Sequence, residues 1–344
     1  MKKYRGLTLI EVLVAIVVSL LTLGALYEAY ISLLRAQKQQ VKIAENNLQV
    51  LMALEYLRKD IELAGFGIPR SVSITLNYNE ANTYATCSPA TYNTAPSGMP
   101  KPLDLGDNTC NNSDYLVIRS TAANLDKAVS RRWGYIYYNG SNWERISLSS
   151  QDFSDADKCV VLDLNRALVS WDVFCKNFTG NNTSMIYFLF GVNDGTLRMP
   201  FNRVDYYLRR PNSLPARCNP STYELYRAEI THNGTRNEQP ILDCVFAFQI
   251  VAGRDTNGNG TIDQWSKDLT TLSASDIFSQ VKEIDLYILY QEGTKSRTEV
   301  TENSTVRITY PDGTYEDINV PSRYYRWKLI QMKVKPLNLE DFKL

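Results

Sequence analysis

The chain opens with a short cationic segment, and an almost unbroken apolar run follows. From Leu7 to Leu26 the only residues outside the apolar set are Thr8, Glu11, Ser19, Thr22 and Gly24. A run of about 20 apolar residues is long enough to cross a bilayer as a helix. Lys2, Lys3 and Arg5 precede the run, and cations beside a membrane span favour the cytoplasmic side. The pattern therefore predicts a membrane helix whose N-terminus is cytoplasmic.

Helical spacing continues beyond this run, but on one face only. Apolar residues recur at intervals of three and four, at Ala44, Leu48, Leu51, Leu54, Leu57, Ile61 and Ala64. Gly65, Gly67 and Pro69 then provide a stop signal. We expect one helix over residues 7–65, with its transmembrane part at about 7–34, and a length of roughly 85 Å at 1.5 Å per residue.

Residues 66–344 are predicted to form a β-rich globular domain. From Asp114 onward short runs predict strands, and hairpin turns are predicted at Asn139-Gly140, Asn193-Asp194-Gly195 and Pro311-Asp312-Gly313. Residues 71–113 are rich in Asn, Thr, Ser and Pro, so we expect a long loop at about 71–113 that contains Cys87 and Cys110. The expected fold class is α+β, with a long N-terminal α-helix packed on a mostly antiparallel β domain.

Composition narrows the classes of site that the domain could carry. The chain has 37 basic and 37 acidic residues, which argues against nucleic-acid binding by bulk charge. Its six cysteines form no C-x-x-C pair, and a single histidine makes a zinc site improbable. Behind a membrane segment they indicate disulfides in an oxidising compartment. The candidates are Cys87, Cys110, Cys159, Cys175, Cys218 and Cys244; pairing in chain order is preferred, although the sequence does not choose among the alternatives.

Glu11 is the residue that the membrane pattern does not explain. A carboxylate in the bilayer centre costs roughly 2.5–3.5 kcal/mol on insertion scales and usually marks function. A plain membrane anchor leaves it unexplained. A secretory signal predicts a shorter apolar run with a small-residue cleavage site, for which Thr22-Leu23-Gly24 is a weak candidate.

The stretch RGLTLIEVLVA resembles the type III signal of type IV pilins and type II secretion pseudopilins. The resemblance implies that a prepilin peptidase cuts after Gly6, which makes residues 1–6 a leader peptide, and methylates the new N-terminus at Leu7. It also implies that Glu11 pairs with the N-terminal amine of a neighbouring subunit during assembly. A buried carboxylate is tolerable beside a buried ammonium. Leu7 in place of the usual phenylalanine, and no proline before Pro69, depart from major pilins and suit a minor component better.

Further segments resemble one family of minor pilins, the PilW family. The stretch LEYLRKDIELAGFGIP (residues 54–69) resembles a segment at the same place in that family. The order of YYLRR, ELYR, PILDCVFAFQIVAG and WKLIQMKVKP is also similar. The likeness covers both ends and the region after about Val204, whereas residues 71–200 are mostly unmatched.

One loop has the spacing of a calcium site. GRDTNGNGTIDQW places oxygen-bearing residues at alternate positions with a glycine at the turn, as in an EF-hand loop. The expected ligands are Asp255, Asn257, Asn259, the carbonyl of Thr261, and Asp263. Ser266 stands where the bidentate Glu would be, and Asp268 is a candidate replacement, so we expect a structural Ca²⁺ ion bound weakly, at roughly 10⁻⁴–10⁻³ M. The alternative is an Asn/Gly loop without metal.

Other groupings have simpler explanations than a site. His232 lies beside a turn signal without the context of a catalytic triad. Asp152, Asp155 and Asp157 are expected to cap and solvate, and RYYRWK (residues 323–328) to be a solvated strand face rather than a DNA contact. Nothing in the sequence suggests catalysis.

Together these features predict a minor type IV pilin that is processed by prepilin peptidase, primes pilus assembly and forms the pilus tip. The resemblance implies partnership with other minor pilins, the major pilin, prepilin peptidase and the inner membrane, with a tip adhesin as a further candidate and no nucleic acid. It implies a single-pass inner-membrane protein with a periplasmic C-terminal domain, later found in the pilus at the cell surface. The alternatives are a J-like minor pseudopilin of type II secretion, and a pilus-borne adhesin or DNA-binding module.

Overall fold

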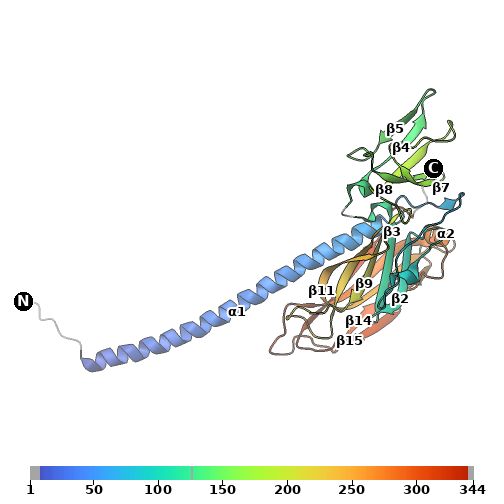
Figure 1. Cartoon of the computed structure of the whole chain (residues 1–344). Helices are drawn as coiled ribbons and strands as arrows, with labels where there is room; N and C mark the ends of the chain where they lie inside the picture. The colour runs from blue at the N-terminus through green and yellow to red at the C-terminus, as the bar shows by residue number, and fades with distance from the viewer. Residues whose placement is uncertain (1–7, 125–126, 340–344) are drawn as a thin grey trace, which may run out of the picture. The chain divides into compact units, whose positions relative to one another are not determined.

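The computed structural model describes residues 8–124 and 127–339. Its first and longest element is the helix α1 (Leu9–Glu62), drawn in blue in Figure 1. The chain divides into two compact units, Met1–Leu48 and Gln49–Leu344, and α1 contributes residues to both. The first unit contains only helix among its described residues, whereas all the β structure lies in the second.

The helix ends slightly before the boundary expected from the sequence, at Glu62 rather than residue 65. Gly65 and Gly67 have φ angles of +80° and +70°, a region that glycine enters without steric cost. The Gly65 N–H donates to the Arg119 carbonyl at 2.9 Å, so the backbone has left the helical hydrogen-bond pattern there. A Cβ atom on Gly67 would lie 2.5 Å from Thr121 Oγ1, so this turn also requires glycine for space.

Within the second unit, the buried stripe of α1 differs in part from the stripe read off the sequence. Val50, Ala53, Leu57 and Ile61 are buried, whereas Leu51 is 65% exposed. The apolar set of the helix is therefore wider than the face that packs. Apolar spacing alone could not select the edge of that face, because buried Asp60 also lies on it.

An antiparallel eight-stranded sheet forms the centre of the second unit. Its strand order is β16-β13-β11-β10-β9-β3-β2, and β12 pairs with β11. The bounds are β2 (Leu103–Cys110), β3 (Ser113–Ser120), β9 (Asn202–Arg209), β10 (Tyr223–Ile230), β11 (Arg236–Arg254), β12 (Gln264–Ser266), β13 (Val281–Glu292) and β16 (Arg326–Val334). One face of this sheet meets the end of α1, from Val50 to Ile61, in the main apolar core. The short helix α2 (Ala274–Gln280) precedes β13.

A second sheet of six strands has the order β1-β7-β6-β8-β4-β5, and β4, β5, β7 and β8 lie together in Figure 1. The bounds are β1 (Ser71–Val72), β4 (Trp133–Tyr138), β5 (Trp143–Ser147), β6 (Lys158–Leu162), β7 (Ala167–Phe174) and β8 (Tyr187–Asn193). Only β1 and β7 pair in parallel among its described strands. The mostly antiparallel β domain and the long helix confirm the predicted α+β fold class.

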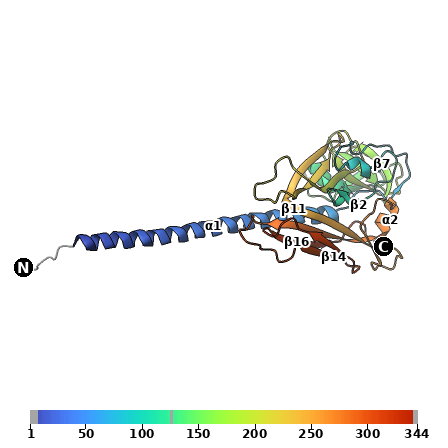
Figure 2. The same ribbon diagram turned by 90° about the horizontal axis from the view of Figure 1, so that it is seen from below.

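A two-stranded hairpin, β14 (Thr305–Thr309) and β15 (Tyr315–Asn319), covers part of the outer face of the larger sheet. Val306 and Ile318 of the hairpin pack against a cluster that contains Ala247, Leu289 and Trp327. In Figure 2, β14 and β16 lie next to one another in red.

Two of the three predicted hairpin turns form, and the third does not. Residues 139–140 join β4 to β5 and residues 311–313 join β14 to β15. After Asn193 the chain instead crosses from β8 in one sheet to β9 in the other. Leu197, Met199 and Phe201 are buried along this crossing, so core packing prevails over the local turn signal.

The loop expected at residues 71–113 is shorter than predicted, because β1 and β2 occupy its two ends. Leu103 and Leu105 of β2 pair with Ile118 and Leu116 of β3 and are fully buried. The irregular part is residues 73–102, hereafter the covering loop, which lies over the outer face of the larger sheet and includes the short 3₁₀ helix η1 (Pro89–Tyr92). Two further 3₁₀ helices are η2 (Thr121–Ala123) and η3 (Ala128–Arg131).

Three disulfides join the six cysteines, Cys87–Cys110, Cys159–Cys175 and Cys218–Cys244. Each cysteine is therefore bonded to its neighbour along the chain. The first bridge ties the covering loop to β2, the second links β6 to the residue that follows β7, and the third joins the segment before β10 to β11.

Candidate functional sites

Glu11 lies in the first turn of α1 and hydrogen-bonds to Thr8, the residue directly before the helix. The backbone N–H of Thr8 donates to Glu11 Oε2 at 2.9 Å, and the Thr8 hydroxyl donates to the same oxygen at 3.0 Å. The Glu11 N–H in turn approaches Thr8 Oγ1 at 3.4 Å. This reciprocal arrangement is a capping box. The predicted processing residues Gly6 and Leu7 lie outside the described residues.

The capping box was readable from the sequence, because Thr8-Leu9-Ile10-Glu11 has the spacing T-x-x-E before an apolar run. It gives Glu11 a local structural role beside the assembly role implied by the resemblance. Both Thr8 contacts use Oε2, and within the described part of the chain Oε1 accepts no hydrogen bond. One oxygen of the carboxylate therefore stays open to a group from another molecule.

The apolar surface around Glu11 is not covered by any other described residue of its own unit. Leu9 is 85% exposed and Ile10 72% exposed, and Leu20 and Leu21 remain 64% and 70% exposed further along. Among the helices of the described residues, α1 alone is long and apolar enough to cross a membrane. A helix that is apolar all round requires lipid or other helices around it.

The loop from Asp255 to Asp263 folds around its first carboxylate. Asp255 is 4% exposed; its Oδ1 accepts the N–H groups of Gly258 and Asn259 at 2.8 and 3.1 Å. Its Oδ2 accepts the Gly260 N–H at 2.8 Å. Gly258 and Gly260 have φ angles of +74° and +87°, which allow the chain to curl so tightly. The loop is thus held in one conformation by its own first residue.

The other expected calcium ligands also have partners inside the loop. Asn259 Oδ1 accepts from the N–H of Thr261 at 2.8 Å, and Asp263 Oδ1 accepts from the N–H of Thr256 at 3.0 Å. Ser266 at the twelfth position belongs to β12 and accepts from Arg254 at 3.1 Å. No cluster of three His, Cys, Asp or Glu side chains with metal-binding geometry occurs among the described residues. An ion here would be held by the carboxylates of Asp255 and Asp263 together with amide and carbonyl oxygens, a mixed oxygen set that Ca²⁺ accepts.

Buried charges that sequence reasoning missed connect the helix to the larger sheet. Asp60 of α1 accepts the Tyr206 hydroxyl at 2.6 Å and the Arg227 Nε–H at 2.8 Å, and both ionic side chains are 4% exposed. The sequence signal was a lone acidic residue inside the apolar stripe of the helix. The pairing itself required knowledge of which strands face that stripe.

A second buried network fastens the covering loop to the outer face of the larger sheet. Glu80 is paired with Arg119 at 3.0 Å and Arg203 at 2.9 Å, and all three side chains are fully buried. Arg203 is paired in turn with Asp205 at 2.8 Å. Burial alone would raise the pKa of Glu80, but the two guanidinium groups lower this pKa to about 2. This network fixes the loop in place without forming an open site.

The remaining candidate groups have structural partners. His232 is half-buried; Arg198 N–H donates to its Nδ1 at 3.1 Å, and its Nε2 lies 3.1 Å from Asn202 Oδ1. Burial lowers the pKa of His232 to about 4, so the ring is neutral at pH 7. Asp157 pairs with Arg132 and Asp155 with Lys176. Arg326 and Lys328 of RYYRWK both pair with Glu292.

Comparisons with known proteins bear on the N-terminus. Residues 1–27 match the family model of the prokaryotic N-terminal methylation motif. No curated protein matches the chain. Among solved structures, the chain is similar to a type IV-like pilin from Thermus thermophilus, with a TM-score of 0.25 and 16% identity over 42% of this chain and 70% of that one. So distant a likeness carries no argument. The chain therefore combines a prokaryotic N-terminal methylation motif with a long apolar helix and a mostly antiparallel β domain.

Proposed function

We propose that this protein is a minor type IV pilin of the PilW kind, which is processed at Gly6 and takes part in priming and capping a pilus. The observation that supports it most directly is the match of residues 1–27 to the N-terminal methylation motif. That motif opens a helix whose apolar side chains are exposed all round, and Glu11 stands in its first turn. We propose a role in assembly rather than in chemistry; in support, His232 and Asp157 have structural partners.

The assembly step would use the open oxygen of Glu11. When the helix enters a filament core, its carboxylate loses hydration and requires a cation. The methylated amine of Leu7 in an adjacent subunit supplies one, and the charged pair then selects one axial register among several that apolar packing alone permits. This accounts for a glutamate where any apolar residue would insert more readily.

A Glu11→Gln substitution separates this role from helix capping. Glutamine keeps an acceptor for the Thr8 N–H and removes only the charge. We expect the variant to be inserted, cleaved and methylated, but at least tenfold depleted from sheared surface filaments. Glu28→Gln is the matched control, because it removes a carboxylate from the same helix outside the motif, and it is expected to assemble normally. Normal incorporation of Glu11→Gln would contradict the proposal.

N-terminal peptide mass spectrometry of sheared filaments and membranes identifies the class. A chain that begins at methylated Leu7 in the sheared fraction supports a pilus component. The same species confined to membranes would favour a J-like pseudopilin of a type II secretion system. An intact Met1, or cleavage near Gly24, would contradict both.

We also propose that the loop at residues 255–263 holds a structural calcium ion. Two observations support it: the ligand spacing from Asp255 to Asp263 in the sequence, and a loop whose backbone N–H groups fold onto the nearly buried Asp255 carboxylate. At a free Ca²⁺ concentration of 10–100 times Kd, binding should stabilise the fold by about 1.4–2.7 kcal/mol.

Thermal unfolding with and without millimolar Ca²⁺ tests the calcium proposal. Asn259→Ala should abolish the stabilisation, and Asn303→Ala, in an exposed loop elsewhere, should keep it. An equal response to Mg²⁺, or no difference between the two variants, would contradict a calcium-selective site in this loop.

A further inference from the structure

A pocket with a volume of about 380 Å³ opens beside the Cys87–Cys110 disulfide, where β9 ends and β11 begins. We name it the arginine pocket after the residues that line it: Arg209, Arg210, Arg236 and Glu238, with Tyr84 and Asn111. Its size lies within the range of small-ligand sites, about 300–1,000 Å³. None of these residues contributes to the Glu11 segment or the calcium loop.

The charges in the arginine pocket do not cancel. Three arginines and one carboxylate, Glu238, line the pocket. Both carboxylate oxygens are occupied: Arg209 contacts Oε2, and Arg236 lies 2.8 Å from Oε1. The Tyr207 hydroxyl donates to Oε1 as well. Arg210 is exposed and forms no hydrogen bond or ion pair with the rest of the described chain. The lining therefore has two positive charges in excess.

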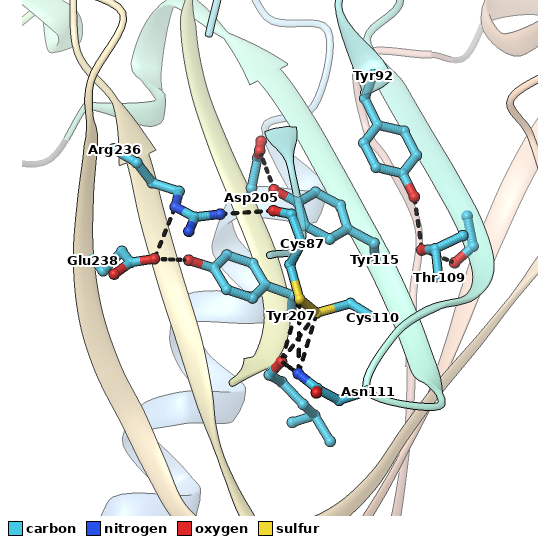
Figure 3. The surroundings of a disulfide bond; sticks show 12 residues. Cys87, Tyr92, Thr109, Cys110, Asn111, Tyr115, Asp205, Tyr207, Arg236 and Glu238 are labelled. Carbon is cyan, nitrogen blue, oxygen red and sulfur yellow. Dashed lines mark hydrogen bonds and ion pairs between the residues drawn. A yellow bond between two sulfur atoms is a disulfide. The ribbon is translucent and has the colours of Figure 1, made fainter. Parts of the chain in front are cut away.

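Arg236 is held rigidly at the back of the pocket. Its guanidinium lies 4.5 Å from the Tyr84 ring centre and 4.9 Å from that of Tyr207, between the two rings. It donates to the Cys87 carbonyl at 2.7 Å, as Figure 3 shows. The side chain is 6% exposed. A cation held in this way loses little side-chain conformational entropy when it binds an anion.

The Cys87–Cys110 disulfide fixes the part of the covering loop that contacts Arg236. Cys110 ends β2, so the bridge holds Cys87 and its carbonyl against the larger sheet. Asn111 donates to the Leu208 carbonyl at 2.7 Å on the other side of the bridge. The Tyr84 hydroxyl accepts the Arg236 N–H at 2.9 Å, so the loop and the start of β11 are joined directly.

The chemistry of this lining selects an oxyanion. Guanidinium groups present paired N–H donors that match carboxylate and phosphate oxygens. An extended nucleic acid would need a continuous cationic track, whereas the cations of the 323–328 segment are paired with Glu292 and Glu299. We propose that the arginine pocket binds a single oxyanion group, a carboxylate or phosphate, of an extracellular ligand, with Arg210 as the residue that meets it first.

Equilibrium dialysis of the full-length protein in detergent tests this binding. The probes are radiolabelled inorganic phosphate and glucuronate, at constant ionic strength maintained with chloride. Saturable uptake at millimolar concentration is expected, with Arg210→Gln weakening it at least fivefold and Arg210→Glu abolishing it. Arg297→Gln is the matched control, because it removes an exposed arginine from another loop, and its uptake should equal that of the wild type.

The two probes also distinguish the source of the anion. Tighter phosphate binding indicates a phosphorylated ligand, and tighter glucuronate binding indicates an acidic glycan. Uptake that does not saturate with either probe, or equal uptake by Arg210→Gln and Arg297→Gln, would overturn the proposal. Because Glu11→Gln leaves the pocket unchanged, the result is independent of the proposed role in pilus assembly.

Discussion

Glu80 is the individual residue on which most of the covering loop depends. Besides its two arginines it accepts the Thr94 N–H at 2.5 Å and the Ala95 N–H at 3.1 Å. Its carboxylate therefore links two segments of the covering loop to strands β3 and β9. Such a fully partnered charge is tolerated in a core, but the loss of one partner leaves the others buried and unpaired.

Glu80→Gln should destabilise the protein strongly. It removes the anion that Arg119 and Arg203 share, and breaking a buried pair typically costs about 3–5 kcal/mol. Urea unfolding followed by tryptophan fluorescence measures the change. Glu302→Gln, which removes an exposed carboxylate, should change the free energy of unfolding by less than about 0.5 kcal/mol. Equal stability of the two variants would refute a structural role for the network.

His232 should make the free energy of unfolding depend on pH. Its pKa is lowered to about 4 in the folded protein, against a usual value of 6.5, so the unfolded chain binds more protons between these two pH values. The stability that the neutral ring contributes is complete above about pH 6.5 and is lost as the pH falls to 4. The loss amounts to roughly 3 kcal/mol at 1.36 kcal/mol per pH unit.

Unfolding free energies of wild type and His232→Gln, measured from pH 7.5 to pH 4.5, isolate this contribution. Glutamine can hydrogen-bond to the same partners but does not titrate in this range. The difference between the two proteins should therefore narrow or reverse as the pH falls. A constant difference would mean that the histidine titrates normally.

Among the elements, β6 and β7 depend on a covalent link for their place in the smaller sheet. Their pairing contains two register irregularities, and the Cys159–Cys175 bridge joins them next to the end of β7. Both cysteines are fully buried. Both strands have a weak signal in the sequence, because KCVVL is short and ALVSWDVF has no clean alternation.

Replacement of both residues, Cys159→Ala with Cys175→Ala, should lower the free energy of unfolding by about 3 kcal/mol. The bridge closes a loop with a sequence separation of 16, and loops of this length give about that value in the chain-entropy account. Thermal and urea unfolding of the variant, with the other two disulfides intact, provide the measurement. A loss below about 1 kcal/mol would argue that residual structure in the unfolded chain already holds these strands together.

The elements differ in how far the sequence could predict them. Long periodic segments such as residues 8–62 and the strands around VDYYLRR were predictable, because their patterns record a single buried face. The division of the strands between two sheets was not, since it is decided at Leu197, Met199 and Phe201, which cross from one to the other. Likewise the Asp60 and Glu80 pairs join residues more than 35 positions apart, and no local pattern indicates such partners.

The candidate sites also differ in whether a local sequence pattern reveals them. The Glu11 motif and the calcium-like loop are contiguous in sequence and could be found there. The arginine pocket could not, because Tyr84, Arg210 and Arg236 come from three separate segments that meet only when the covering loop is fastened to the sheet.

At the scale of the whole molecule, the proposed processing changes the charge of the protein. Loss of Lys2, Lys3 and Arg5 takes the 37 basic residues to 34, whereas all 37 acidic residues remain. The mature chain should therefore focus at a lower pH than the precursor, whose sequence pI is about 6.6. Isoelectric focusing of the protein from cells with and without prepilin peptidase should resolve the two forms. Identical focusing positions would mean that the leader is retained.

The chain-order pairing of the cysteines has a consequence for biosynthesis. The bridges span 23, 16 and 26 positions, and none encloses or overlaps another. If the segments that follow the membrane helix enter an oxidising compartment in chain order, both members of one pair are exposed there before the first member of the next. An oxidase that couples each free thiol to the next one to appear therefore makes only native bonds. Formation of these disulfides should need a thiol oxidase but no disulfide isomerase to rearrange non-native bonds.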